Sequence, residues 1–92
     1  MKLNRADNLH RRGVVQAVRE LSTKRMYRGI HLFTNTYKNS YTVKVYTTGD
    51  NYEFNKKLSL IANEHGGKLK IIPSIYNSVR MSAIISFTRS DV

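Results

Sequence analysis

Residues 50–67, with the sequence DNYEFNKKLSLIANEHGG, contain the most regular pattern in the chain. From Phe54 onward, apolar side chains and one histidine follow after four, seven, eight and eleven residues, the spacing that places them on one face of an α-helix. Asp50, with an acidic residue three positions later, resembles a capping box. The two glycines that close the stretch favour the left-handed backbone that ends a helix. We therefore predict an amphipathic helix over residues 52–65.

Four segments around this helix alternate between apolar and polar residues, the pattern of half-buried β-strands. Two of them precede the helix, at about residues 29–35 and 41–48, and the turn-forming residues between them predict a hairpin. Two follow it, at about residues 68–76 and 79–88. Pro73 has no N–H to donate to a neighbouring strand, so we expect a bulge, a strand end or a sheet edge there.

The N-terminal segment has a second helix pattern, over about residues 5–24. Its apolar stripe must pack beside helix 52–65, on the other face of the sheet, or on another copy of the protein. Gly13 costs about 1 kcal/mol relative to alanine in a helix interior. A break at this glycine would leave residues 1–11 as a flexible basic arm.

These elements together predict an α+β fold of the order αββαββ. We expect a single domain over residues 1–92, with a basic helical arm at 1–28 and a ββαββ core at 29–92. In that core, a four-stranded, mainly antiparallel sheet packs on helix 52–65. The sheet side chains predicted to face the helix are Tyr41, Val43, Val45, Leu69, Ile71, Val79, Met81, Ala83, Ile85 and Phe87.

The charge of the chain is unusually positive for its length. Sixteen Lys and Arg against six Asp and Glu leave a net charge of +10 on 92 residues. Residues 1–30 contribute +6 of this charge, and six of their eight basic residues are arginine. A guanidinium group can bind two phosphate oxygens at once, whereas an ammonium group acts as a point charge. This excess is more than solubility requires and favours a polyanion, above all a nucleic acid, as the partner.

Arginines recur every seven residues in the N-terminal helix, at Arg5, Arg12 and Arg19, so they share the side opposite the apolar stripe. Asn8 and Gln16 extend this polar side, four residues before and after Arg12. An ordinary solvated helix face is the alternative interpretation. We predict phosphate contacts from the basic residues of this segment, which are Arg5, Arg11, Arg12, Arg19, Lys24, Arg25 and Arg28.

The sheet face turned away from the helices forms a predicted second surface. Aromatic side chains among Lys and Arg can stack bases at about 1–3 kcal/mol each, while the cations bind phosphates. Phe33 and His31 lie near this surface, although aromatic residues also occur in ordinary amphipathic strands. RNA is favoured over DNA because no helix begins with residues that read base edges, whereas stacking aromatics are present. The residues predicted for this surface are Lys44, Tyr46, Lys70 and Arg80.

Several classes of protein are disfavoured by what the sequence lacks. It has no cysteine, no pair of acids spaced for hydrolysis, and no signature around His10, His31 or His65, so we predict no enzyme, no metal and no cofactor. The Gly-Gly-Lys at 66–68 ends a helix and is therefore no phosphate-binding loop. No apolar run reaches the length of a membrane span, and the first residues lack the apolar segment of a signal peptide. We expect a soluble, cytoplasmic protein.

The chain has one Pro, no Cys and no Trp, and it is rich in Tyr, Asn and Lys. In this it resembles the small basic early proteins of T-even-type bacteriophages. Residues 30–89, with a helix that follows the turn at 48–51, are similar in element order to the double-wing DNA-binding domain of the phage activator MotA. The resemblance rests on element order and turn chemistry and carries over no functional residue. It implies a role in redirecting host transcription, controlling RNA or blocking a defence system such as a toxin–antitoxin ribonuclease.

We therefore predict a non-enzymatic nucleic-acid-binding module that acts in host takeover or anti-defence, on a protein–RNA assembly in the host cytoplasm. The alternative is an inhibitor whose basic face docks on an acidic host protein or on a nuclease, because charge steering serves both roles. An anionic membrane surface is disfavoured, since the stripe of the first helix consists mainly of Val and Ala. The spare stripe and an uncovered sheet edge favour a homodimer.

Overall fold

The computed structural model describes residues 2–22, 30–48, 52–73 and 80–91. These residues form helices and strands in the order αββαββ, which confirms the predicted α+β class and element order. The elements are α1 (Arg5–Ser22), β1 (His31–Thr36), β2 (Ser40–Thr48), α2 (Tyr52–Glu64), β3 (Lys68–Pro73) and β4 (Arg80–Thr88). The predicted helix cap at Asp50, and the predicted ends of the first helix and the third strand at residues 23–24 and 74–76, lie outside the described residues.

The strands form one antiparallel sheet in the order β1-β2-β4-β3. The predicted hairpin of β1 and β2 is confirmed, with Leu32 opposite Val45. β2 and β4 lie in the middle, where Val43 is opposite Ile85. β1 and β3 are the edge strands, and Pro73 is the last residue of β3, where a missing N–H leaves the ladder intact.

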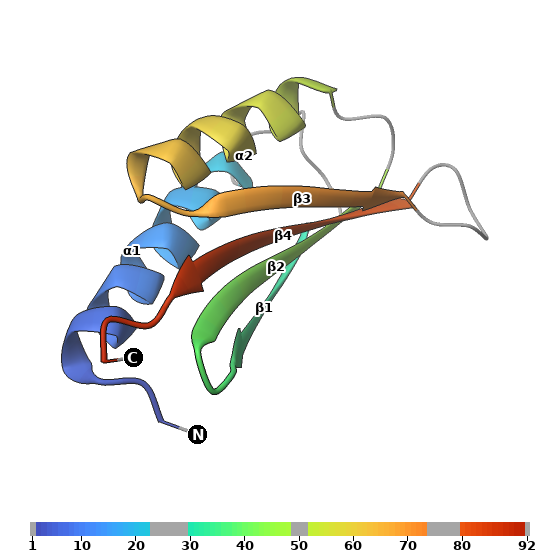
Figure 1. The fold of residues 1–92 in the computed structure, drawn as a ribbon. Helices are drawn as coiled ribbons and strands as arrows, with labels where there is room; N and C mark the ends of the chain where they lie inside the picture. The colour runs from blue at the N-terminus through green and yellow to red at the C-terminus, as the bar shows by residue number, and fades with distance from the viewer. Residues whose placement is uncertain (1, 23–29, 49–51, 74–79, 92) are drawn as a thin grey trace.

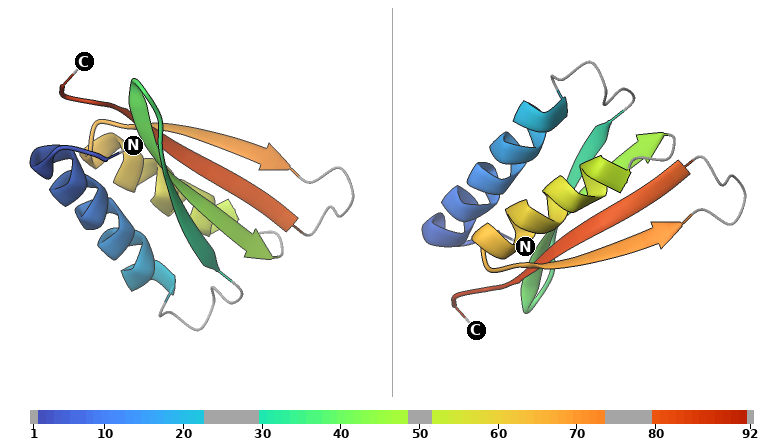
Figure 2. Two further views of the ribbon diagram at one scale, coloured as in Figure 1. Left: turned by 90° about the horizontal axis from the view of Figure 1, so that it is seen from below. Right: turned by 90° about the horizontal axis from the view of Figure 1, so that it is seen from above.

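Both helices cover the same face of the sheet, and among the described elements none covers the opposite face (Figure 1). Helix α1 lies on the β1 side of this layer and α2 on the β3 side, and the two helices touch each other (Figure 2). The molecule therefore has two layers, with one face of the sheet left open.

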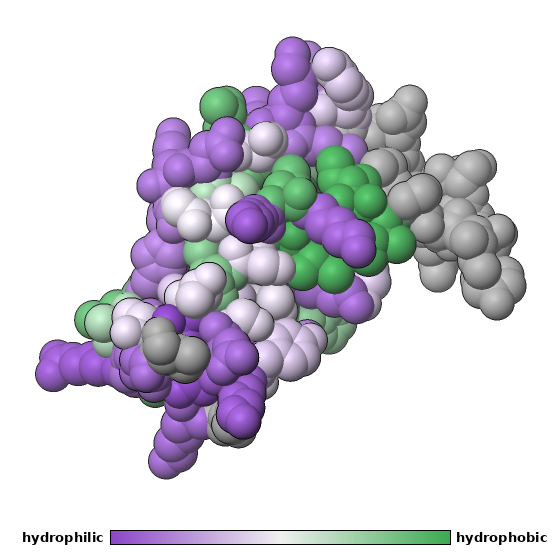
Figure 3. Space-filling view, in the orientation of Figure 1, coloured by the Kyte–Doolittle hydropathy of each residue, from purple (hydrophilic) through white to green (hydrophobic). Residues whose placement is uncertain are grey.

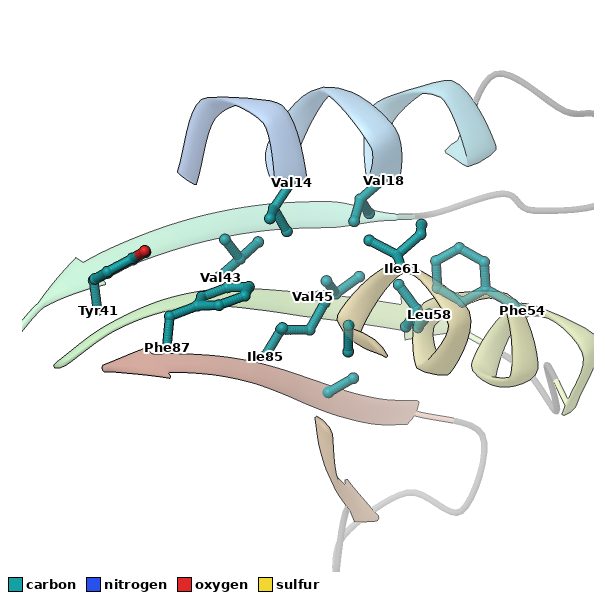
Figure 4. Close-up of a cluster of buried hydrophobic side chains, with 12 residues drawn as sticks. Val14, Val18, Tyr41, Val43, Val45, Phe54, Leu58, Ile61, Ile85 and Phe87 are labelled. Carbon is teal, nitrogen blue, oxygen red and sulfur yellow. The ribbon is translucent and has the colours of Figure 1, made fainter. Parts of the chain in front are cut away.

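The two helices and the sheet share one hydrophobic core. Val14 and Val18 from α1 point toward Leu58 and Ile61 from α2 and toward the middle of the sheet (Figure 4). The apolar stripe of α1 thus packs in the same layer as α2. Because this stripe is covered within one chain, it does not require a second copy of the protein. The buried hydrophobic residues are Val14, Val18, Tyr41, Val43, Val45, Phe54, Leu58, Ile61, Ala62, Ala83, Ile85 and Phe87.

Helix α1 begins at Arg5, as the sequence predicts. The helix runs without a break through Gly13, so residues 5–11 are helical and form no flexible arm. Asn4 caps it, because its Oδ1 accepts the backbone N–H of Asp7 at 2.7 Å. In its first turn Ala6 is exposed and Asp7 is buried. The carboxylate of Asp7 accepts the backbone N–H of Ser90 at 2.9 Å, which satisfies this buried charge.

The end of α2 confirms the predicted glycine stop. Gly66 has a φ of 71°, its N–H donates to the carbonyl of Asn63, and the N–H of Gly67 donates to the carbonyl of Ala62. This pair of hydrogen bonds is the Schellman motif. Gly67 also lies directly against Phe87, since a Cβ there would come within 2.9 Å of three ring atoms. The first glycine is needed for its backbone angle and the second for close packing.

One predicted core residue, Ile71, is less buried than expected. Ile71 faces the helix layer but is 38% exposed, because it lies on the edge strand β3, where fewer neighbours cover it. Val79 lies outside the described residues.

Candidate nucleic-acid interface

A groove runs between α1 and the edge strand β1. Its volume is about 500 Å³, within the range of pockets that bind small molecules. The helix contributes basic, amide and apolar side chains, and Thr34 forms the strand side of the groove. We call it the α1–β1 groove and define it by its lining residues, which are Asn8, Arg11, Arg12, Val15, Gln16, Arg19 and Thr34.

Helix periodicity explains how these side chains meet. Asn8, Arg12, Gln16 and Arg19 follow at intervals of three or four residues, so they form one row along α1. Because Val14 and Val18 are buried in the core, that row of side chains points away from the core. It lies on the side of α1 that borders the edge strand β1. Arg11 also lines the groove, and its Nη1 donates a hydrogen bond to Thr36 Oγ1 at 2.8 Å. This bond ties the helix to β1.

The groove is electropositive because its lining brings three guanidinium groups together without a carboxylate. Among the described residues, the side chain of Arg12 makes no hydrogen bond or ion pair, and the same holds for Arg5 at the start of the helix. The guanidinium groups of Arg5 and Arg12 therefore offer their donors to an anion. Arg5 is exposed but does not line the groove, which extends along α1 only from residue 8 to residue 19.

The open face of the sheet carries a second predicted cluster. Phe33 on β1 and Tyr46 on β2 are 54% and 37% exposed, and their rings meet edge to face with centroids 5.4 Å apart. Lys44 Nζ lies 5.3 Å from the centre of the Tyr46 ring, a cation–π contact. The structure thus brings the predicted residues Lys44 and Tyr46 together with the ring of Phe33.

The remaining predicted site residues are more widely spread. Lys70 is exposed on β3, two strands away from β2 and therefore about 10 Å from the aromatic cluster. In the view of Figure 3, hydrophobic side chains gather over β3 and β4, and hydrophilic side chains lie across them. Among the described residues of β3, the exposed large apolar ones are Ile71 and Ile72. Arg80 is the first residue of β4, opposite Thr48. Lys24, Arg25 and Arg28 lie outside the described residues.

Sequence reasoning missed the contacts that hold the two ends of the chain together. Arg89 donates to both carboxylate oxygens of Asp91, at 2.8 and 3.0 Å, and to the backbone carbonyls of Tyr37 and Lys2. The hydrogen bond of Asn4 Nδ2 to Ser90 Oγ joins the same ends. The only local signal was the short spacing of Arg89 and Asp91. These contacts fix the start of α1 beside the hairpin, and so they help to position the groove.

A polar cluster lies beneath the first turns of α1. His10 Nδ1 lies 2.9 Å from Tyr41 Oη, and the His10 ring meets the Phe87 ring edge to face at 4.9 Å. The ring centroids of His65 and His10 are 5.7 Å apart, and His65 Nδ1 donates a hydrogen bond to the carbonyl of Ile61. Both histidines are half-buried and neither lines the groove, so their contacts are those of packed side chains.

The environment of Tyr41 changes its acidity. Burial raises the pKa of Tyr41 above its ordinary value of 10.0. The negative charge of Asp7 and a hydrogen bond to it raise this pKa further, while the nearby Arg11 guanidinium group lowers it. The folded protein therefore holds this phenol proton at pH values at which the unfolded chain releases it.

Stability should consequently fall as the pH rises from 10 through the folded-state pKa of Tyr41, by at most about 1.4 kcal/mol per pH unit for this one proton. A Tyr41→Phe variant has no phenol proton, so we expect its unfolding free energy to fall less over this pH range. Urea unfolding of both proteins between pH 8 and 11 measures it. The difference in unfolding free energy between the two should shrink above pH 10, and a constant difference would show that Tyr41 titrates normally.

No protein-family model matches the chain, and no curated protein matches it. Over the described residues, no helix combines the length and the apolar character that a membrane crossing requires. In the same part of the chain, no three His, Cys, Asp or Glu side chains gather as metal ligands would.

Proposed function

We propose that the protein is a non-enzymatic nucleic-acid-binding module, that RNA is favoured over DNA, and that the α1–β1 groove binds the phosphate backbone. One observation carries the proposal. Three arginines from a single helix line one groove, and no carboxylate lines it with them. Guanidinium groups bind phosphate oxygens in pairs, and several of them along one groove can follow successive phosphates.

The preference for RNA rests on the kind of surface beside the groove. Exposed aromatic rings on an open sheet suit unpaired bases, which are common in RNA loops and ends. Asn8 and Gln16, which line the groove with the arginines, supply amide donors and acceptors for base edges or for the 2′-hydroxyl group. The role we propose is that of a phage factor for host takeover or anti-defence, acting on a protein–RNA assembly in the host cytoplasm.

The test is the salt dependence of binding to a fluorescently labelled 12-nucleotide RNA, followed by anisotropy. Three phosphate contacts predict a slope of about −2 or steeper in a plot of log affinity against log salt concentration. An Arg12→Glu/Arg19→Glu double variant should bind about 30-fold more weakly, equivalent to about 2 kcal/mol. It should also flatten the slope by about 1.4, because two contacts are lost.

The matched control is Lys38→Glu/Lys56→Glu, which makes the same change in net charge at two exposed lysines that do not line the groove. We expect its affinity to fall by no more than about threefold, since only long-range attraction changes. Equal losses in the two double variants would show that net charge, and not the groove, governs binding. A protein that co-purifies in fixed ratio after nuclease treatment, with no affinity for RNA, would favour the alternative of an inhibitor.

A further inference from the structure

We infer that the ligand is a single strand that crosses the edge strand β1, with its phosphates in the α1–β1 groove and an unpaired base stacked on Phe33. This inference rests on the proposed function and adds the class of nucleic acid and the path of the chain. It follows from the placement of two consecutive residues of β1, Phe33 and Thr34.

The two residues point to opposite sides of the sheet. Thr34 is opposite Val43 and lines the groove on the helix side, whereas Phe33 is opposite Lys44 and lies on the open face. Only the thickness of β1 therefore separates the phosphate-binding groove from the aromatic ring. A chain that leaves the groove past Thr34 meets Phe33 next.

Nothing in the described fold blocks this path. β1 is an edge strand, so its outer side pairs with no other strand of the sheet, and α1 lies beside it on one face only (Figure 2). Such an edge presents unpaired N–H and C=O groups. These groups are free to hydrogen-bond a base edge or a 2′-hydroxyl group as the strand passes over them.

Phe33 is ready to accept a base. Its edge-to-face contact with Tyr46, at an interplanar angle of 81°, leaves at least one face of its ring open, and the side chain is more than half exposed. Lys44 lies over Tyr46 and so holds the second ring in place. The ring that receives the base is therefore oriented before the ligand arrives, which reduces the entropy lost on binding.

The aromatic end of this path excludes a duplex. Bases inside a duplex are stacked on their own neighbours and offer no free face to Phe33. Only an unpaired strand can use the groove and the ring together.

The experiment compares a 12-nucleotide single-stranded RNA that carries one 2-aminopurine with the same RNA annealed to its complement. Anisotropy gives the affinities, and 2-aminopurine fluorescence reports stacking. We expect the single strand to bind at least tenfold more tightly than the duplex. Phe33→Ala should weaken single-strand binding about tenfold and abolish the fluorescence change, Phe33→Trp should restore both, and duplex affinity should not change.

The control is Tyr52→Ala on α2. Tyr52 is 68% exposed and has Lys56 Nζ 5.2 Å from its ring centre, so it reproduces an exposed aromatic–lysine pair away from the groove. Its removal should leave single-strand affinity unchanged.

Four results would overturn the inference. Equal affinity for the duplex and the single strand, or an unchanged affinity in Phe33→Ala while Arg12→Glu/Arg19→Glu still weakens binding, would remove the crossing path and leave the proposed function standing. Loss of binding in Phe33→Ala with none in the arginine variant would place the ligand on the open face alone. Absence of binding to either RNA would end the proposed function as well.

Discussion

A Phe54→Ala variant is expected to lose about 3–5 kcal/mol of its unfolding free energy. Phe54 is fully buried on α2, among the side chains that α1, α2 and the sheet contribute to the core (Figure 4). A domain of 92 residues has a total stability of about 5–14 kcal/mol, so this change removes a large part of it. Thermal unfolding followed by circular dichroism should show a melting temperature lower by at least 12 °C or so.

Leu60→Ala provides the matched control on the same helix. Leu60 lies on the outer side of α2 and is exposed, so its truncation should change the unfolding free energy by less than about 0.5 kcal/mol. A small loss in Phe54→Ala, comparable with that of the control, would mean that α2 does not pack on the sheet as described.

The second large effect is expected from Val18→Asp on α1. Val18 is fully buried between the helix layer and the sheet, and a carboxylate there has no partner among the core residues, all of which are apolar apart from the Tyr41 hydroxyl. Burial of an uncompensated charge costs about 3–5 kcal/mol. Because α1 shares its core with the sheet, we expect the whole domain to unfold, and the dispersed amide signals of the strands should collapse in an NMR spectrum.

The control here is Gln16→Asp, which adds the same charge to the exposed side of α1 and should cost less than about 1 kcal/mol. If the strand signals of Val18→Asp stayed dispersed while only the helix melted, α1 would be a separate arm on an independent ββαββ core. That outcome would also remove the fixed wall of the α1–β1 groove.

The fold could be predicted from the sequence where the pattern of apolar residues is long and keeps a single spacing. α2 shows it best, since Phe54, Leu58 and Ile61 repeat at the helical spacing and two glycines end the pattern. The strands β2 and β4 alternate strictly enough for their buried sides to be predicted. The place of α1 was not predictable, because its apolar stripe fits a helix, a sheet face or a second copy equally well, and only the packing of Val14 and Val18 decides among them.

The site was predicted in part for the same reason. The seven-residue spacing of Arg12 and Arg19 correctly indicated a shared face, since that spacing depends on the helix alone. The groove itself depends on where β1 lies relative to α1, and Thr34 carries no sequence signal for it. Asp7 is a similar case, because the partner of its buried carboxylate is the backbone N–H of Ser90, which is 83 positions away in the chain.

The central claim is that the arginine-lined groove between α1 and β1 is the surface that binds nucleic acid. An NMR titration with the single-stranded 12-nucleotide RNA tests it most directly, through the backbone amides and the arginine Nε–Hε signals. We expect the largest shifts at Arg11, Arg12 and Arg19, followed by the amides of Phe33 and Thr34. Shifts confined to α2 and β3, or none at saturating RNA, would contradict the claim.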